Sequence, residues 1–210
     1  MFYRSLLAAA VLGFGLTGFA ASSKADIVVD FLQNACQSGL GCNGNTSLVA
    51  DATIKDISGG VTITYKIDDS AFAFYQAGNP PVTTFNPNPT SVSGTPTTID
   101  GSAVTWQEYP GTYHINGSTY SDGAGYTPGH NDPFSAFTLT LMGVTASAFL
   151  DGLLAVDMCK LSSATACSGT GFINGSLAAV PLPPAALLFG TAMAGLGMLG
   201  MRRRRAAATA

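Results

Sequence analysis

The chain has 210 residues, enough for one ordinary domain with accessory segments. Its formal net charge of −3 averages unlike parts, because residues 26–180 hold all 12 acidic residues, only three lysines and no arginine, a net charge of −9. A body this acidic repels a phosphate backbone, which excludes nucleic acid as a partner.

The first 25 residues have the features of a signal peptide. Arg4 supplies a positive start, and residues 6–19 are apolar or small throughout. Ser23 and Ala25 place small residues at the −3 and −1 positions of a cleavage site before Asp26. The alternative is a membrane anchor, but this stretch is short for about 30 Å of hydrocarbon and its three glycines disfavour a helix. We therefore expect residues 1–25 to be removed on export.

Four cysteines follow in the exported part: Cys36, Cys42, Cys159 and Cys167. An even number of cysteines in an oxidising compartment indicates two disulfides, for which three connectivities exist. A zinc site would require CxxC-type spacing or nearby histidines, and the sequence has neither. Each neighbouring pair encloses a short polar loop, and closing such a loop stabilises a fold by about 2–3 kcal/mol in the chain-entropy model. The spacing favours the local pairs Cys36–Cys42 and Cys159–Cys167.

Residues 26–179 are predicted to form one domain built of strands. Apolar and polar residues alternate with a period of two in GVTITYKI (60–67) and in AFTLTLM (136–142), as expected for half-buried strands. Further segments are rich in β-branched and aromatic residues and are bounded by Gly, Asn, Asp and Pro. These segments are 27–33, 47–57, 70–76, 103–109 and 171–180.

Two long stretches are predicted to be irregular. Residues 77–97 contain five prolines, each of which removes a backbone donor, and residues 116–133 are rich in Gly, Asp and Asn. Residues 150–158 fit a helix or a strand equally well. The fold class predicted from this pattern is all-β, an antiparallel β-sandwich of about eight strands.

No catalytic motif stands out. The body has two histidines, His114 and His130, but no serine with glycine at both the −2 and +2 positions. HExxH, P-loop and GxGxxG patterns are also absent from the sequence. Paired carboxylates for glycoside cleavage remain open, since nothing in the sequence selects a pair. We therefore predict that the chain is not an enzyme.

Two groups are candidates for ligand binding. Asp122, Asn131 and Asp132 lie in the Gly-rich stretch and are candidates for calcium, the one cofactor considered, although no DxDxDG pattern supports them. Ordinary turn chemistry is the alternative explanation. An aromatic group could stack on a sugar, with core packing as its alternative. Its members are Trp106, Tyr109, Tyr113 and Tyr120.

The C-terminal part combines a proline strip, an apolar span and an arginine run. Residues 182–201 are uncharged, and 20 residues of helix extend about 30 Å, the thickness of a bilayer core. Pro181, Pro183 and Pro184 prevent the helix from continuing upstream. The positive-inside rule places the arginines in the cytoplasm, and with them the tail 206–210. These arginines are Arg202, Arg203, Arg204 and Arg205.

This arrangement resembles the PEP-CTERM class of sorting signals, and closely its VPLPA variant. The matching strip is Val180, Pro181, Leu182 and Pro183, followed by Pro184 where the variant has alanine. Leu182 stands where the PEP form has glutamate, which bears on the subtype of sorting enzyme. LPxTG signals would need threonine and glycine after Leu182-Pro183, and GPI signals lack the arginine block. The resemblance covers residues 180–205 alone and implies nothing about the fold of the body.

The resemblance implies a Gram-negative host that carries an exosortase, a membrane cysteine enzyme, and an association with exported polysaccharide. We therefore expect an exported protein that is anchored transiently in the inner membrane with its body outside. Its final location would be the cell surface or the extracellular matrix, where the body is structural or adhesive. The alternative is a secreted glycan-binding module or glycan-active hydrolase that uses residues 106–132.

Overall fold

The computed structural model describes residues 26–178, except for 43, 77–80, 97, 100–101, 128–131, 151–153 and 164. The predicted signal peptide up to Ala25 and the predicted sorting signal, 180–205, lie outside the described residues. Among the residues that are described, no helix combines the length and apolar character that crossing a bilayer requires.

The described part of the chain is all-β, as predicted, with 15 strands and two short 3₁₀ helices. The first half contains β1 (Ile27–Cys36), η1 (Ser38–Leu40), β2 (Leu48–Ile57), β3 (Gly60–Ile67), β4 (Phe72–Phe74), β5 (Thr83–Phe85), β6 (Ser91–Thr95) and β7 (Thr98–Ile99). The second half contains β8 (Ser102–Ala103), β9 (Thr105–Glu108), β10 (Tyr113–Ile115), β11 (Ser118–Tyr120), β12 (Asp122–Thr127), β13 (Ala136–Met142), η2 (Ala146–Phe149), β14 (Ala155–Ser163) and β15 (Ala166–Leu177).

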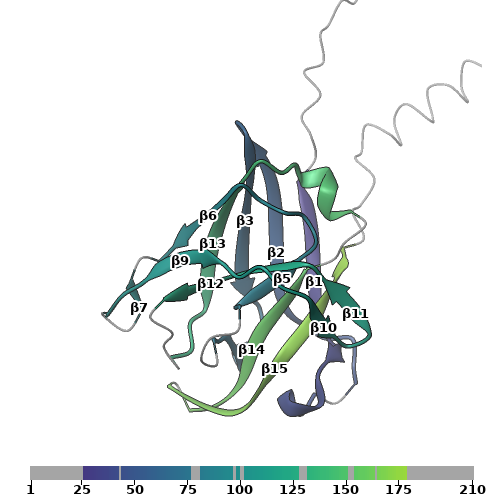
Figure 1. Ribbon diagram of the computed structural model, residues 1–210. Coiled ribbons are helices and arrows are strands. Elements are labelled where there is room, and N and C mark those ends of the chain that lie inside the picture. The colour runs from purple at the N-terminus through teal and green to yellow at the C-terminus, as the bar shows by residue number, and fades with distance from the viewer. Residues whose placement is uncertain are drawn as a thin grey trace, which may run out of the picture.

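Eleven strands form one antiparallel sheet (Figure 1). Ten of them follow the order β6-β13-β3-β2-β1-β15-β14-β5-β12-β9, and β4 pairs with β14 beside β5. The hairpins β10–β11 and β7–β8 form two further small sheets. Every pair of strands in these sheets runs in opposite directions, which confirms the predicted antiparallel pairing.

The predicted sandwich differs from the structure in how its two layers are joined. Eleven of the strands belong to a single hydrogen-bonded sheet that curls around the core, so that β3 faces β5 across the interior. The Tyr65 hydroxyl on β3 lies 2.9 Å from the Thr83 hydroxyl on β5, which in turn donates to the Ala155 carbonyl at 2.9 Å. Strongly twisted sheets of this width tend to curl, because each strand is rotated relative to the next.

A tryptophan closes the seam between the two edge strands, β6 and β9. The indole of Trp106 lies directly over Gly94, where an added Cβ would be 2.7 Å from the ring. Its Nε1 donates to the Pro96 carbonyl at 2.8 Å, and its ring stacks on Phe137 with centroids 5.3 Å apart. Side-chain packing therefore joins β6 to β9 at this point.

Both stretches predicted to be irregular contain strands. Residues 77–97 include β5 and β6, because prolines such as Pro81 and Pro96 stand just outside the paired residues. Residues 116–133 include β11 and β12, since Asn116 and Gly117 form a tight turn with φ of 48° and 80°. In β12, Gly125 leaves room for the Gln76 side chain, which pairs with the Tyr126 backbone through both amide atoms at 2.8 and 2.9 Å. The ambiguous segment 150–158 contributes the start of β14.

Candidate functional site

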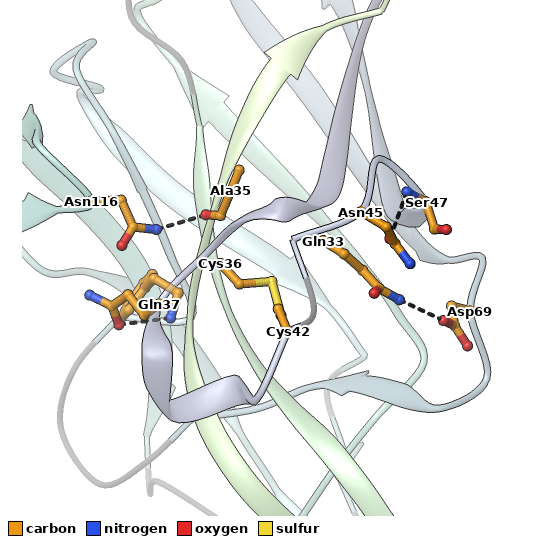
Figure 2. Close-up of a disulfide and its surroundings, with 10 residues drawn as sticks. Gln33, Ala35, Cys36, Gln37, Cys42, Asn45, Ser47, Asp69 and Asn116 are labelled. Carbon is orange, nitrogen blue, oxygen red and sulfur yellow. Dashed lines mark hydrogen bonds between the residues drawn. A yellow bond between two sulfur atoms is a disulfide. The ribbon is translucent and has the colours of Figure 1, made fainter.

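The structure pairs Cys36 with Cys42 and Cys159 with Cys167, which confirms the predicted local connectivity. The Cα atoms are 6.1 and 5.5 Å apart, within the usual range for disulfides. The first disulfide closes the loop that carries η1 (Figure 2), and the second joins the two strands of the β14–β15 hairpin. Both therefore restrain short segments of the same region of the sheet.

The loop of the first disulfide lies against the hairpin of the second. Gly39 and Gly169 meet at the crossing, where a side chain on Gly169 would overlap the Gly39 carbonyl. Gln37 bonds to Phe172 through both its backbone N–H and its side-chain oxygen, at 2.9 and 3.0 Å. From a third segment, the side-chain amide of Asn116 donates to the Ala35 carbonyl at 2.7 Å (Figure 2). Two glycines thus permit a contact that hydrogen bonds hold in place.

The predicted aromatic group does not form an exposed surface. Trp106 and Tyr120 are 5 % and 1 % exposed, so their ring faces are covered by the protein. Tyr109 and Tyr113 are half-buried, and the Tyr113 hydroxyl donates to the Tyr109 carbonyl at 2.8 Å. The four rings therefore do not form one surface for a sugar, because the rings of Trp106 and Tyr120 are buried in the interior.

The predicted calcium group is not assembled either. Asp122 lies in strand β12 rather than in a loop, is 2 % exposed, and accepts the Gly123 N–H at 2.6 Å. Burial and the neighbouring Glu108 carboxyl raise the pKa of Asp122 to about 6. Asp132 lines a hollow whose lining contains neither Asp122 nor Glu108, and Asn131 is outside the described residues. Within the described ranges, no cluster of three or more His, Cys, Asp or Glu side chains is placed to hold a metal ion.

A groove that the sequence did not predict lies where β3 leads into β4 and β13 begins. Two adjoining hollows of about 680 and 320 Å³ share Pro96, Pro133 and Phe134 as their common wall. The larger hollow is also lined by Asp68, Ser70, Phe72 and Leu161, and the smaller by Thr98, Asp132 and Thr165. The sequence feature that points to this groove is Asp132-Pro133-Phe134, in which an aromatic residue directly follows a proline between two strands.

The position of Phe134 in the groove is fixed by its neighbours. Its backbone exchanges two hydrogen bonds with Phe74, at 2.8 and 3.1 Å. Its ring also contacts the rings of Phe74, Tyr126 and Phe137, with centroids 5.6–6.0 Å apart. Phe134 is half-buried, so part of the ring faces the groove in a preset orientation.

The second disulfide supports the floor of this groove. Strand β4, which supplies Phe72, pairs with β14 so that Ala73 is opposite Cys159 and Phe72 is opposite Lys160. The next rung is the hydrogen bond from the Leu161 N–H to the Ala71 carbonyl, at 2.8 Å. The Cys159–Cys167 bond therefore fixes the strand on which the floor of the groove rests.

Carboxylates give the rim of the groove a negative character. Asp68 and Asp132 are part of the lining, and no lysine or arginine is among the described lining residues. Lys66 lies 4.0 Å from Asp68 and balances part of its charge. Asp51 on β2 is paired with Asp30 on β1. Burial and the nearby Asp68 carboxyl raise the pKa of Asp51.

The groove and the ends of the described chain lie at opposite ends of the sheet. Asp26 precedes β1 and bonds to Lys55 at 3.0 Å, and Ala178 follows β15 and donates to the Val28 carbonyl at 2.9 Å. These two positions are therefore neighbours. The register of β1, β2 and β3 places the groove roughly 10–20 Å further along the strands, towards the β14–β15 hairpin.

No protein-family model, curated protein or solved structure matches this chain.

Proposed function

We propose that this chain is an exported protein of the cell surface or extracellular matrix of a Gram-negative bacterium, with a structural or adhesive body. One observation carries the proposal: the proline strip, the uncharged span and the four arginines occur in that order within residues 180–205. The two disulfides of the body support it, because they are compatible with an oxidising compartment outside the cytoplasm.

In this proposal the terminal segments act in sequence. The signal peptide directs export and is removed after Ala25, and the apolar span then holds the body outside the inner membrane. The prolines keep residues 180–184 extended, and an extended strip exposes the backbone that an exosortase must grip. The arginines keep the tail on the cytoplasmic side while the strip is cleaved.

Comparing the masses of precursor and mature protein in the native host tests this proposal. Wild-type protein should lose both terminal segments. Deleting residues 202–205 should leave the strip intact but block processing, because the span is no longer fixed at its depth. Replacing Pro181 and Pro183 with alanine should extend the helix and block cleavage while the anchor stays in place. Wild-type protein that keeps its whole tail in the inner membrane would refute sorting and indicate a plain anchored protein.

The alternative function, a secreted glycan-binding module or glycan-active hydrolase, gains one observation. The groove around Phe134 combines an aromatic ring, two prolines, carboxylates and hydroxyls in an open hollow. This observation supports binding, and it is compatible with a sorted surface protein that adheres to a polysaccharide.

A further inference from the structure

The groove has the mixed lining typical of a site for a polar organic ligand. Such sites are concave, largely apolar, and carry a few polar groups that orient the ligand. Here Phe134, Phe72 and Leu161 supply apolar surface, and Asp68 and Ser70 supply hydrogen-bonding groups at the rim. Because the two hollows are open, they suit a chain that passes through them better than they suit an enclosed small molecule.

The charges of the groove restrict the ligand further. An anionic chain would face Asp68 and Asp132 with no lysine or arginine among the described lining residues to receive it. The charge alone would also admit a cationic partner, because the exposed Lys66, 4.0 Å from Asp68, balances only part of the negative charge. A neutral ligand rich in hydroxyls fits best, since hydroxyls donate to carboxylates and hydrogen bonds to charged groups are the stronger kind.

The apolar wall fits the same ligand. A pyranose ring has an apolar face of C–H groups, which packs against an aromatic ring or a proline while its hydroxyls point sideways. Phe134 stands between Pro133 and the start of β13, and Pro96 faces the same space from the end of β6. Because the bonds to Phe74 already fix Phe134, little conformational freedom is lost when a ligand binds.

We propose that the groove around Phe134 binds a chain of neutral sugars, and that the body adheres through it to a polysaccharide. This inference rests on the proposed function in placing the protein outside the cell. The groove lies at the far end of the sheet from Asp26 and Ala178, the positions at which the two terminal segments join the body. A body anchored at one end thus presents the groove at the other.

The test is isothermal titration calorimetry on the protein purified from its host, in whichever form accumulates there. The probes are linear oligosaccharides of glucose, mannose and galactose. An alginate oligosaccharide and an oligolysine peptide are titrated separately as charged comparison probes. At least one neutral oligosaccharide should release heat, and the alginate oligosaccharide should be silent. Residues 26–180 carry a net charge of −9 and attract oligolysine at many positions, so any heat from oligolysine should be unchanged when the groove is blocked. Because the protein is used in either form, failed processing would overturn the sorting proposal and leave the binding result interpretable.

Variants locate the site. F134A should weaken binding by at least about tenfold, the loss typical of a central aromatic anchor. Because Phe134 also packs on the core, S70W is the second variant: Ser70 is exposed at the rim, and an indole there blocks the groove without removing a core contact. L150A is the matched control, because Leu150 is an apolar residue 48 % exposed and is not part of the groove lining.

Two sets of results would overturn the proposal. Silence of every neutral oligosaccharide with the folded wild-type protein would do so, as would a response to alginate or oligolysine alone. Equal binding by wild-type, S70W and L150A would place any sugar site elsewhere. Loss of binding in S70W and F134A, with L150A unchanged, is the result that the groove predicts.

Discussion

The two ends of the curled sheet are held by different means. At the groove end, two disulfides fix the loop of η1 and the β14–β15 hairpin, and the two segments cross at Gly39 and Gly169. At the opposite end, the contacts that the structure describes are non-covalent: the ion pair of Lys55 with Asp26 and hydrogen bonds such as those from the N–H groups of Gly143 and Ala178. Covalent restraint is thus concentrated where the groove lies, and the end that joins the terminal segments depends on non-covalent contacts.

The largest expected effect comes from the seam, which belongs to neither end. W106A removes the ring that packs on Gly94 and Phe137, and truncation of a buried tryptophan costs about 3–5 kcal/mol. Both ends should therefore lose stability together in a urea unfolding curve followed by far-ultraviolet circular dichroism. W106F keeps a ring but loses the hydrogen bond to Pro96, so its free energy of unfolding should fall between those of wild type and W106A. A loss below about 1 kcal/mol for W106A would show that the seam is not closed by this ring.

The disulfides should separate stability from binding. C36A/C42A and C159A/C167A should each lower the free energy of unfolding by about 2–3 kcal/mol, because both loops are short. Only C159A/C167A should also weaken oligosaccharide binding, since β14 carries the floor of the groove through Ala73 and Phe72. Each variant serves as the control for the other. Equal losses of binding would show that the two bridges support the groove alike.

A smaller effect is expected where the β10–β11 turn meets β1. N116A loses the bond from the amide to the Ala35 carbonyl at 2.7 Å and also places a less tolerant residue at φ 48°. N116G loses the bond alone, since glycine adopts this backbone conformation readily. We expect losses of about 1 kcal/mol for N116G and more for N116A, measured by thermal unfolding. If N116G were as stable as wild type, the bond would contribute nothing.

The last expected effect differs in kind, because it is a dependence of stability on pH that arises at Asp122. The pKa of Asp122 is about 6 in the folded protein, above the ordinary 3.8. Between about pH 4 and pH 6 the folded state therefore holds a proton that the unfolded state has released. The stabilisation is therefore complete below about pH 4 and is lost as pH rises to about 6. The melting temperature of D122N, a neutral side chain of the same shape, should fall less over this range than that of wild type. Parallel melting curves for the two would show that the pKa of Asp122 is not raised.

The alternation of residues predicted the strands well where one face is buried and the other is wet. GVTITYKI became β3, and AFTLTLM became β13. The same rule failed for β12, because its residues 122–126 are all buried and a strand buried on both faces shows no alternation. Glycine there provides space for Gln76 rather than a turn, and composition alone cannot distinguish the two uses.

The candidate site was harder to predict than the fold. The disulfides followed from loop length, a local property of the sequence. The groove joins residues 68, 96, 134 and 161, which are brought together only by the order of the strands. Its aromatic character makes Trp106 a ligand candidate in the sequence, but in the structure its ring packs over Gly94 and closes the sheet. Which aromatic residue faces solvent depends on the curl of the sheet, and the pattern of one strand does not specify it.

Amide hydrogen exchange in C159A/C167A tests most directly whether the second disulfide holds the groove end. The reporters are the N–H groups of Leu161 and Phe134, which bond to Ala71 and Phe74 at the groove, with Ala178 as the reference at the other end. Relative to the oxidised wild type, the N–H groups of Leu161 and Phe134 should exchange at least about tenfold faster. The N–H of Ala178 should exchange at an unchanged rate, because it follows the last described strand and exchanges through local opening rather than through global unfolding. Equal acceleration at all three positions, or none at Leu161 and Phe134, would contradict a local brace.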